Sequence, residues 1–446
     1  MNRPAPSQSD VARGPVLGLA VVVVATLCVL PASPTAAQTF SVIHNFTGND
    51  GYRPDSGVIL DRGGTIYGAT AFGGNLRCGS GRDPGSGGGG PAGCGVVFRL
   101  KKQGNSWVET PLWDFTGING SYTTTPGELT IGPNGSLYGP ELLGGNEEGG
   151  RVYNLRPGSS APSSVIAPWN YAPVWDFCNG NDACYPNKVV FDAAGNMYGS
   201  STYGGNSNLG AVWEMTPAGN GTWNESVIYG FLGPLYGDGD RGRGVALDAQ
   251  GNIYGTTYYG GNTECFDNYG CGVVYELTHT SSGWTETILH VFQQNSEGGA
   301  PGPLMRDSAG NLYGVTSTGA VSNNGTIWKL SPSGGGNWTL TILYTFPYQT
   351  VDDGGPYRLV MDSAGVLYGI NNWGGANNLG NVFKLVPGSN GNWTYVDLHD
   401  FGSMTGNADG CLGKGPVAVD SSGNIYGVAE ECGSIDGGTA WEITPQ

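Results

Sequence analysis

Histidine is the residue that acid–base chemistry uses most often, and this sequence has four of them. A Ser-His-Asp or Cys-His centre needs an imidazole that is free to take a proton from the nucleophile. His44, His290 and His399 instead occupy one place in a recurring segment that Trp or Tyr fills elsewhere, and His279 falls in a short turn. We therefore expect packing roles for the first three, and we assign no catalytic residue. No zinc-hydrolase, phosphate-loop or dinucleotide motif appears in usable context.

Paired carboxylates offer a second chemistry, because glycoside hydrolysis needs only two of them at a suitable separation. Nine acidic residues fall in long connections or at strand starts of the repeat described below. The sequence does not define the distances between them, so a catalytic pair and a solvated acidic surface both stay open. No metal site or cofactor is predicted, since the recurring D-x-x-G-N phrase offers too few oxygen ligands for a calcium loop. The nine acids are Glu128, Asp182, Asp240, Glu297, Asp352, Asp353, Asp409, Glu430 and Glu431.

Aromatic and basic side chains offer a third possibility, which is ligand binding. Four aromatic rings stand just before Gly-Gly pairs, where they could stack on sugar faces or pack against the next structural unit. Basic residues near strand starts could ring a central channel and attract a polyanion. The predicted ligand-binding residues are the aromatics Phe72, Tyr203, Tyr259 and Trp373, and the basic residues Arg53, Lys188, Arg243 and Arg358, with Lys414 at a similar position.

A repeat must position these residues. A segment that ends in Tyr-Gly recurs in seven copies spaced 55 to 71 residues apart, and in each copy a phrase such as DSAGN, with Gly in fourth place, precedes the Tyr-Gly. A type I turn closed by a residue with positive φ needs Gly there, and Asp at the first position can bond the turn amides, so the phrase predicts a β-hairpin. The turn glycines are Gly64, Gly135, Gly195, Gly251, Gly310, Gly365 and Gly423.

Two more strands complete each copy. A third strand carries a central aromatic such as Phe98 or Trp441, and the fourth ends in a phrase such as PLWDF. In that fourth strand a Trp precedes the penultimate ring or His by six residues, as Trp107 precedes Trp113, and an even spacing predicts that both rings share one face. Four short antiparallel strands in seven copies predict an all-β fold, a seven-bladed β-propeller.

The two ends of the chain supply a closure. The last copy stops at TAWEITPQ without its fourth strand, while QTFSVIHNF near the amino terminus has the pattern of that missing strand. We therefore predict that residues 39–46 pair with the strand around Trp441 and complete the last blade. Such pairing removes free sheet edges that would invite aggregation.

With these motifs in view, the chain resembles a known repeat family. The phrase D-x-x-G-N-L-Y-G, the following G-G-N and the G-T-V-F-K-L-like strand are similar to the Gloeo_Verruco (GloVer) tandem repeat of secreted bacterial proteins. The resemblance covers essentially all of residues 39–446. It implies an extracytoplasmic bacterial protein and leaves the biochemical activity open.

Residues 1–37 differ in composition from the rest. Arg3 and Arg13 precede an apolar run and a small-residue stretch, the layout of a secretory signal peptide, so we expect cleavage after Ala37 or, alternatively, an uncleaved anchor. Residues 38–446 then form a single propeller domain, expected to be a secreted monomer without a membrane span. Its net charge of −18, after loss of Arg3, Arg13 and Asp10, disfavours nucleic acid and anionic membranes as partners.

Eight cysteines remain in residues 38–446, an even number that suits an oxidising compartment. Spacing without C-x-x-C argues against zinc. Although eight cysteines allow 105 connectivities, hairpin geometry favours neighbours. The expected bridges are Cys78–Cys94, Cys178–Cys184, Cys265–Cys271 and Cys411–Cys432.

All eight cysteines fall in connections from second to third strand, or from a fourth strand to the next blade. In a propeller these connections emerge on one face, here called the long-loop face. Long, covalently stiffened loops on a rigid scaffold favour a binding function there. We expect a non-catalytic binding module for polysaccharide or an envelope protein, with a polysaccharide-cleaving enzyme and a structural component of the cell envelope as alternatives.

Overall fold

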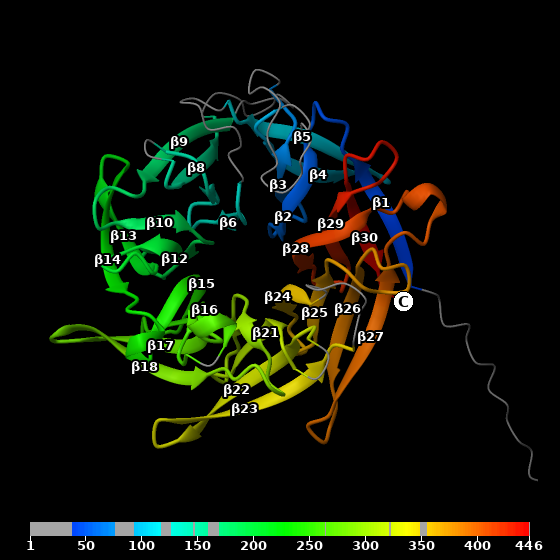
Figure 1. Cartoon of the computed structure of the whole chain (residues 1–446). Coiled ribbons are helices and arrows are strands. Elements are labelled where there is room, and N and C mark those ends of the chain that lie inside the picture. Colours follow the sequence, from blue (N-terminus) through cyan, green and yellow to red (C-terminus); the bar gives the residue numbers. More distant parts are fainter. Residues whose placement is uncertain are drawn as a thin grey trace, which may run out of the picture. The chain divides into compact units, whose positions relative to one another are not determined.

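A computed structural model describes residues 38–75, 93–116, 126–145, 148–158, 169–263, 265–320, 323–347 and 355–445. These residues form seven antiparallel blades of four strands arranged in a ring, with the first strand split in two in blades 3 and 5 (Figure 1). The predicted seven-bladed β-propeller is therefore confirmed. The expected signal peptide, residues 1–37, lies outside the described residues. Within the described ranges no helix is long and apolar enough to cross a membrane.

The strands follow one another blade by blade around the ring. Blades 1 and 2 consist of β2 (Tyr52–Leu60), β3 (Ile66–Phe72), β4 (Val96–Gln103) and β5 (Ser106–Asp114), then β6 (Thr130–Ile131), β7 (Leu137–Glu141), β8 (Arg151–Pro157) and β9 (Trp169–Asp176). Blades 3 and 4 consist of β10 (Ala183–Pro186), β11 (Val190–Phe191), β12 (Met197–Gly204), β13 (Ala211–Gly219) and β14 (Thr222–Gly230), then β15 (Gly239–Leu247), β16 (Ile253–Gly260), β17 (Val273–Thr280) and β18 (Gly283–Val291).

The remaining blades return to the start of the chain. Blades 5 and 6 consist of β19 (Gly299–Pro301), β20 (Met305–Arg306), β21 (Leu312–Thr318), β22 (Thr326–Gly334) and β23 (Asn337–Thr345), then β24 (Pro356–Met361), β25 (Leu367–Asn371), β26 (Asn381–Pro387) and β27 (Trp393–Asp400). Blade 7 consists of β28 (Cys411–Val419), β29 (Ile425–Glu431), β30 (Thr439–Thr444) and β1 (Thr39–Asn45). Three short 3₁₀ turns lie in connections: η2 (Pro234–Tyr236), η3 (Phe266–Asn268) and η4 (Thr405–Asn407).

The repeated phrase is a turn with a hydrogen-bonded Asp at its start. In DSAGNLYG, Asp307 Oδ1 accepts hydrogen bonds from the backbone amides of Ala309 (2.9 Å) and Asn311 (2.8 Å). Its Oδ2 accepts one from the hydroxyl of Tyr313 at 3.1 Å. Gly310 has φ of +87°, a left-handed conformation that glycine adopts without steric cost. The predicted hairpin is confirmed, and the Tyr of Tyr-Gly closes it.

The glycine of Tyr-Gly is needed for a different reason than the turn glycine. Gly314 lies directly across from Trp328 in the β21–β22 ladder, and a Cβ there would stand 2.3 Å from the Trp328 ring. The ring therefore covers the bare backbone, and it is fully buried. The same cross-strand pair occurs in every blade: Gly68 with Phe98, Gly139 with Tyr153, Gly199 with Trp213, Gly255 with Tyr275, Gly314 with Trp328, Gly369 with Phe383, and Gly427 with Trp441.

The predicted closure of the ring by the amino-terminal strand is confirmed. β1 pairs antiparallel with β30, with Thr39 opposite Thr444, Val42 opposite Trp441 and Asn45 opposite Thr439. Figure 1 shows the blue β1 lying against the red strands of the carboxy-terminal end. The amino-terminal strand thus supplies the outer strand of blade 7.

The prediction that the two rings of each fourth strand share one face is wrong. In β5, Trp113 pairs with Val97 but Pro111 pairs with Phe98, so the strand contains one extra residue, a β-bulge. One inserted residue reverses the alternation of side chains. Trp107 consequently contacts Tyr426 of blade 7, while Trp113 stacks on a ring of blade 2. The fourth strands of the other blades carry the same shift.

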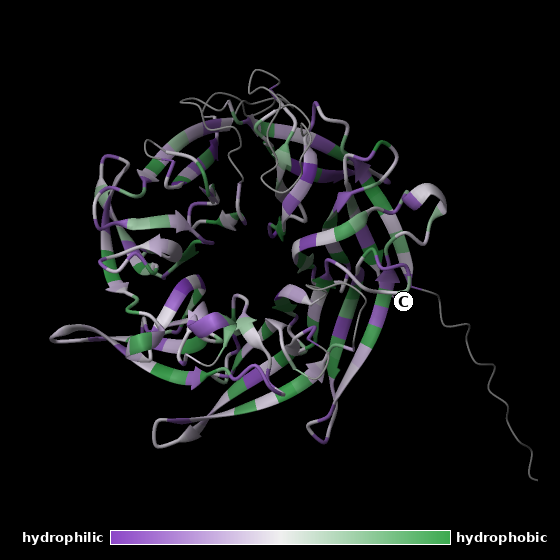
Figure 2. Cartoon of the chain, viewed as in Figure 1, coloured by the Kyte–Doolittle hydropathy of each residue, from purple (hydrophilic) through white to green (hydrophobic). Residues whose placement is uncertain are grey.

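The hydrophobic core lies between blades rather than in one centre. Figure 2 shows hydrophobic residues recurring along the strands all around the ring. The core clusters join neighbouring blades; one, for example, holds Tyr67 and Val97 of blade 1 with Leu137 and Tyr153 of blade 2. Each blade therefore buries its apolar surface only against its neighbours, which explains the importance of closing the ring.

Three of the four expected disulfides are present, joining Cys178 to Cys184, Cys265 to Cys271, and Cys411 to Cys432. Cys78 lies outside the described residues, so its bridge to Cys94 stays a prediction. The three bridges lie in or beside connections of the long-loop face, as the sequence indicated.

Candidate functional site

A cavity of about 490 Å³ lies on the axis of the ring, and residues from all seven blades line it. The first strand of each blade is innermost, so the cavity wall is built from residues of those strands and the loops before them, together with second-strand residues such as Tyr258. Most of the wall is proline, glycine and small polar residues. The charged and tyrosine side chains among the lining residues are Asp55, Glu128, Lys188, Arg243, Tyr258, Tyr357, Arg358 and Lys414.

Of the five basic residues named from the sequence, four line the cavity: Lys188, Arg243, Arg358 and Lys414. Arg53 is not among the lining residues, and its guanidinium pairs with the carboxylate of Glu431 at 2.6 Å. Four cations thus face one cavity in a chain whose net charge is −17.

Two of the four cations share one buried acid. Glu128 accepts hydrogen bonds from Arg358 at 2.7 Å and lies 3.2 Å from the ammonium group of Lys188. Burial by itself would raise the pKa of Glu128, but the two cations outweigh it and lower the pKa. Burial and the neighbouring Arg358 lower the pKa of Lys188. This triad joins blades 2, 3 and 6 across the axis.

Arg243 differs from the other cations. Its guanidinium lies 4.2 Å from the ring centre of Tyr258, and no ion pair connects it to an acid within the described ranges. Its Nε is buried without a hydrogen-bond partner there. A cation that is stacked on a tyrosine but not neutralised is available to an anionic group in the cavity.

The cavity wall also contains an acid, Asp55, whose pKa is raised above that of an ordinary aspartate. Asp55 lines the cavity near Lys414, which is paired with Glu430 at 3.2 Å. Burial, followed by repulsion from Glu430, raises the pKa of Asp55 to about 7. Asp55 is therefore partly protonated near neutral pH.

The four predicted aromatics do not form one site. Phe72 is buried, with 5% of its surface exposed. Trp373 lies beside a separate pocket of about 180 Å³ that Tyr344 and Tyr395 also line. Tyr203 and Tyr259 lie close together at the boundary of blades 3 and 4.

Between Tyr203 and Tyr259 stands Arg241, a residue that sequence reasoning missed. Its guanidinium lies 5.2 Å from the Tyr203 ring centre and 4.9 Å from that of Tyr259. Arg241 has φ of +62°, so a left-handed backbone conformation rather than regular strand periodicity directs its side chain. Because Tyr259 precedes the loop of η3, its ring also lies 5.4 Å from Tyr269.

Exposed apolar residues gather around this Tyr–Arg–Tyr stack. Tyr269 is 52% exposed, and the neighbouring connection that contains η2 exposes Leu235 and Tyr236 by 86% and 76%. η2 contacts β16, the strand that carries Tyr258 and Tyr259. The long-loop face of blades 3 and 4 therefore combines exposed rings with two arginines beside the cavity, the combination typical of a binding surface.

A second set of polar residues recurs where neighbouring blades meet. We call each contact between the fourth strands of two successive blades an outer seam. The seam holds the penultimate ring or His of one fourth strand, an acid from the following connection, and a fourth-strand residue of the next blade. Five seams show the acid: His44, Asp50 and Glu109; Trp175, Asp182 and Glu225; Tyr229, Asp238 and Glu286; His290, Glu297 and Leu340; His399, Asp409 and Phe40.

The three seam histidines are strand residues, and each is hydrogen-bonded to an acid. The His399 imidazole lies 2.9 Å from Asp409 Oδ2, and Ser403 donates its hydroxyl proton to the same oxygen. The hydroxyl thus bonds the acid and not the imidazole, which is unlike a nucleophilic triad.

In the remaining two seams, whose connections are partly outside the described residues, tyrosine stacks on the penultimate ring: Tyr171 on Trp113 and Tyr395 on Tyr344.

The acids named in the sequence analysis lie in different surroundings. Glu128, Glu430 and Glu431 are ion-paired with cations, Glu297 and Asp409 are hydrogen-bonded to histidines, and Asp240 lies 4.0 Å from Arg241. Asp182 meets Glu225, which sequence reasoning did not single out. Asp352 and Asp353 lie outside the described residues.

The comparisons with known proteins agree with the fold. The model of the Gloeobacter/Verrucomicrobia repeat matches residues 266–446. No curated protein matches the sequence significantly. Among solved structures, the virginiamycin B lyase of Staphylococcus aureus, crystallised with quinupristin, is similar with a TM-score of 0.51 and 12% identity, over 91% of this chain and 99% of that one.

A second similar structure is the extracellular domain of a hybrid two-component system of B. thetaiotaomicron. It has a TM-score of 0.51 and 13% identity, over 90% of this chain and 39% of that one. At such identities the likeness concerns the propeller fold alone, because one propeller scaffold carries many functions.

Proposed function

We propose that this protein, of which residues 266–446 match the Gloeobacter/Verrucomicrobia repeat, is an extracytoplasmic, non-catalytic binding module that takes an acidic carbohydrate at the mouth of its central cavity. The disulfides support an oxidising compartment. The propeller supplies a rigid scaffold, and the long-loop face supplies the contact surface.

Arg243 is the observation that carries this proposal. It lines the cavity, stacks on Tyr258 and has no acidic partner in the described part of the chain. Its guanidinium is partly buried, with a buried Nε that lacks a hydrogen-bond partner there, and a carboxylate or sulfate group of a ligand would satisfy it with charge-assisted hydrogen bonds. The other cavity cations add to an attraction for anions, since only part of their charge is neutralised.

The aromatic surface supports a carbohydrate rather than a small free anion. Tyr203, Tyr259 and Tyr269 lie on the long-loop face next to Arg241, which is separated from Arg243 by one residue. Sugar rings present apolar faces that stack on tyrosine, while their acidic groups bond arginine. A chain of sugars could therefore enter the cavity with one acidic residue and lie across the rings with the next.

Glycan-array binding, followed by titration calorimetry with uronic-acid and neutral oligosaccharides of equal length, tests the proposal. We expect binding of the acidic series alone, weakened by added salt. Arg243→Gln should weaken binding at least about tenfold, which corresponds to about 1.4 kcal/mol. Arg306→Gln is the matched control, because Arg306 also stacks on a tyrosine, Tyr254, but outside the cavity lining. Equal affinity for neutral glycans, or equal losses in both variants, would contradict the proposal.

A polysaccharide-cleaving enzyme is the second candidate, and Asp55 is the observation that favours it. An acid with a pKa near 7 in a cavity beside Lys414 has the proton affinity that a general acid needs. A reducing-sugar release assay on the same oligosaccharides distinguishes the candidates. Release of sugar that Asp55→Asn abolishes would make the protein an enzyme, whereas binding without release supports the module.

A further inference from the structure

We propose that His44, Asp50 and Glu109 form a binding site for one divalent transition-metal ion of the zinc class, placed at the outer seam where the ring closes. This inference is independent of the proposed carbohydrate binding. It concerns the seam between blade 7 and blade 1, on the outer strands, and not the central cavity.

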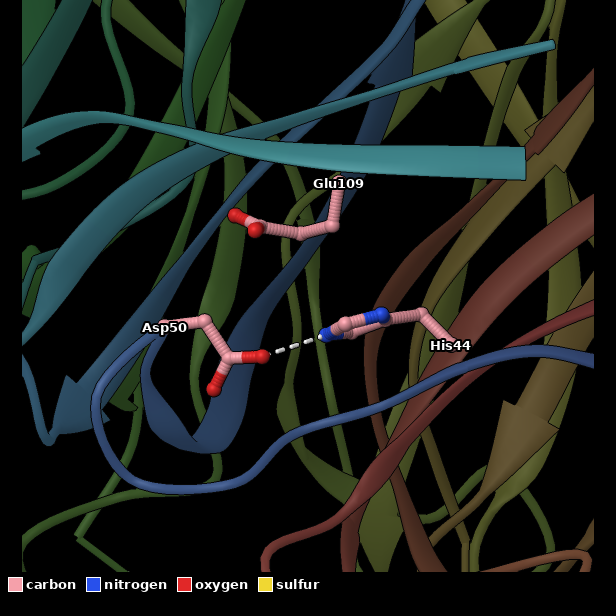
Figure 3. Close-up of side chains that lie close together, drawn as sticks. All are labelled: His44, Asp50 and Glu109. Carbon is pink, nitrogen blue, oxygen red and sulfur yellow. Dashed lines mark hydrogen bonds and ion pairs between the residues drawn. The ribbon is translucent and has the colours of Figure 1, made fainter. Parts of the chain in front are cut away.

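Three segments bring the site together, as Figure 3 shows: His44 projects from β1, Asp50 from the connection after it, and Glu109 from β5 of blade 1. The His44 Nε2 lies 2.9 Å from Asp50 Oδ2. One ligand atom of each residue lies within 4.8 Å of the others. The side chains are partly buried, with 19% of His44 and 17% of Asp50 exposed, so an ion can reach them from solvent.

Asp50 is already oriented for a ligand. Its Oδ1 accepts hydrogen bonds from the backbone amide of Thr47 at 2.7 Å and from the Thr47 hydroxyl at 2.8 Å. The other oxygen, Oδ2, is thereby directed towards His44. Hydrogen bonds of this kind from outside the coordination shell fix the position of metal ligands in many proteins.

Glu109 has an unsatisfied oxygen. Its Oε1 is buried and has no hydrogen-bond partner in the described part of the chain. The carboxyl group instead faces Asp50, another acid, across the seam (Figure 3). A buried acceptor without a donor is unfavourable, and a cation bound between the two carboxylates would remove both the repulsion and the missing contact.

The other outer seams serve as internal comparisons. Two of them hold His and an acid, but Leu340 or Phe40 stands at the place of Glu109. Two others hold two carboxyls, but Trp175 or Tyr229 stands at the place of His44. Within the described residues, only the closing seam combines an imidazole with two carboxylates.

This donor set selects the class of ion. One imidazole nitrogen and two carboxylate oxygens suit zinc and similar transition metals, whereas calcium takes six to eight oxygen ligands. Three protein ligands leave at least one coordination position to water. Zinc lies about 2.0–2.2 Å from such ligands, so the three ligand atoms must move closer around the ion, and the His44–Asp50 hydrogen bond must give way to two bonds to the ion.

A bound ion would hold the closed ring together. His44 belongs to the strand that closes blade 7, and Glu109 belongs to blade 1, so an ion between them links the amino-terminal strand to the next blade. An ion that binds only the folded, closed ring stabilises it by mass action. We therefore expect the metal to raise the melting temperature.

The experiment uses the full chain without a histidine tag, first depleted of metal with EDTA and then titrated with ZnCl₂ by calorimetry. We expect one ion per chain and a rise in Tm of about 3 °C or more. With CoCl₂, absorption bands of a four- or five-coordinate ion with a nitrogen ligand should appear. CaCl₂ at equal concentration should change neither signal.

Two variants and one matched control locate the ion. His44→Gln and Glu109→Gln should each weaken zinc binding at least about 100-fold and abolish the cobalt bands. Glu286→Gln is the control, because Glu286 holds the same register position in a seam with two acids but no histidine, and it should bind zinc like the parent. No saturable binding in the parent, or unchanged affinity in Glu109→Gln, overturns the proposal. Calcium binding that His44→Gln leaves intact overturns the assignment to the zinc class.

Discussion

The central cavity gathers cations from four blades, whereas the outer seams gather carboxyls. In the cavity, Glu128 is compensated by Arg358 and Lys188, and its pKa is lowered despite burial. At the closing seam, burial and the neighbouring Asp50 and Asp114 raise the pKa of Glu109 to about 8. The pKa values of Glu225 and Glu286 are raised too, by burial and then by their neighbouring aspartates. This comparison shows that a chain of negative net charge can keep a group of cations at its central cavity when other carboxyl groups lie between the outer strands.

The largest expected effect comes from removing the closing strand. Deletion of residues 38–46 leaves the cavity lining intact but removes the outer strand of blade 7 and the seam that contains His44. The exposed edge of β30 should cause aggregation or a large loss of Tm, because an unpaired strand edge can pair with other chains. Thermal melts and light scattering measure both. A truncated chain as soluble and stable as the parent would show that closure is dispensable.

The next effect separates rings that stabilise the fold from rings that bind. Phe72→Ala should cost about 3–5 kcal/mol of unfolding free energy, because the ring is buried. Tyr259→Ala should change stability little and weaken glycan binding by about 1–3 kcal/mol, the scale of one large contact. Urea unfolding and titration calorimetry report the two quantities. Tyr203→Ala and Trp373→Ala complete the series, and strong destabilisation by Tyr259→Ala without a binding defect would assign that ring to the core.

A smaller effect concerns pH and the seams. The pKa of Glu109 is about 8 in the folded chain against an ordinary value of 4.5 for a glutamate, so the folded state binds more protons than the unfolded state between these values. Stability from this group is therefore fully present below about pH 4.5 and is lost as pH rises through 8. With EDTA present, Tm should fall by a few degrees between pH 6 and pH 9. The combined variant Glu109→Gln, Glu225→Gln, Glu286→Gln should show a flatter profile, and an identical slope would refute the role of the seam acids.

The smallest effect is expected at Arg53. This arginine was grouped with the cavity cations by sequence, but it pairs with Glu431 at a partly exposed position outside the lining. Arg53→Gln should change the free energy of unfolding by less than about 1 kcal/mol, as for other exposed ion pairs. Its glycan affinity should equal that of the parent, in contrast to Arg243→Gln. A loss of affinity comparable to that of Arg243→Gln would extend the binding site beyond the cavity.

Much of the fold could be predicted because its signals are local and recur. The turn glycine of DSAGN, the Tyr that closes the turn, and the glycine covered by a ring such as Trp328 all act within one hairpin or one strand pair. Seven repetitions of this pattern determined the number of blades. The missing fourth strand of the last copy determined the closure by residues 39–46, and short spacing within connections determined three disulfides.

The candidate site depended on contacts that no local pattern encodes. Glu128 and Arg358 are 230 positions apart in sequence and meet only because seven first strands converge on one axis. A single bulge residue turns Trp113 away from the face of Trp107, and the sequence carries no mark of that insertion. The same bulge in β1 directs His44 towards blade 1, where Glu109 stands. The sequence by itself determined the repeating scaffold, since hairpins are specified by neighbouring residues; the tertiary structure decided which charges meet, since ring closure brings together side chains from distant copies.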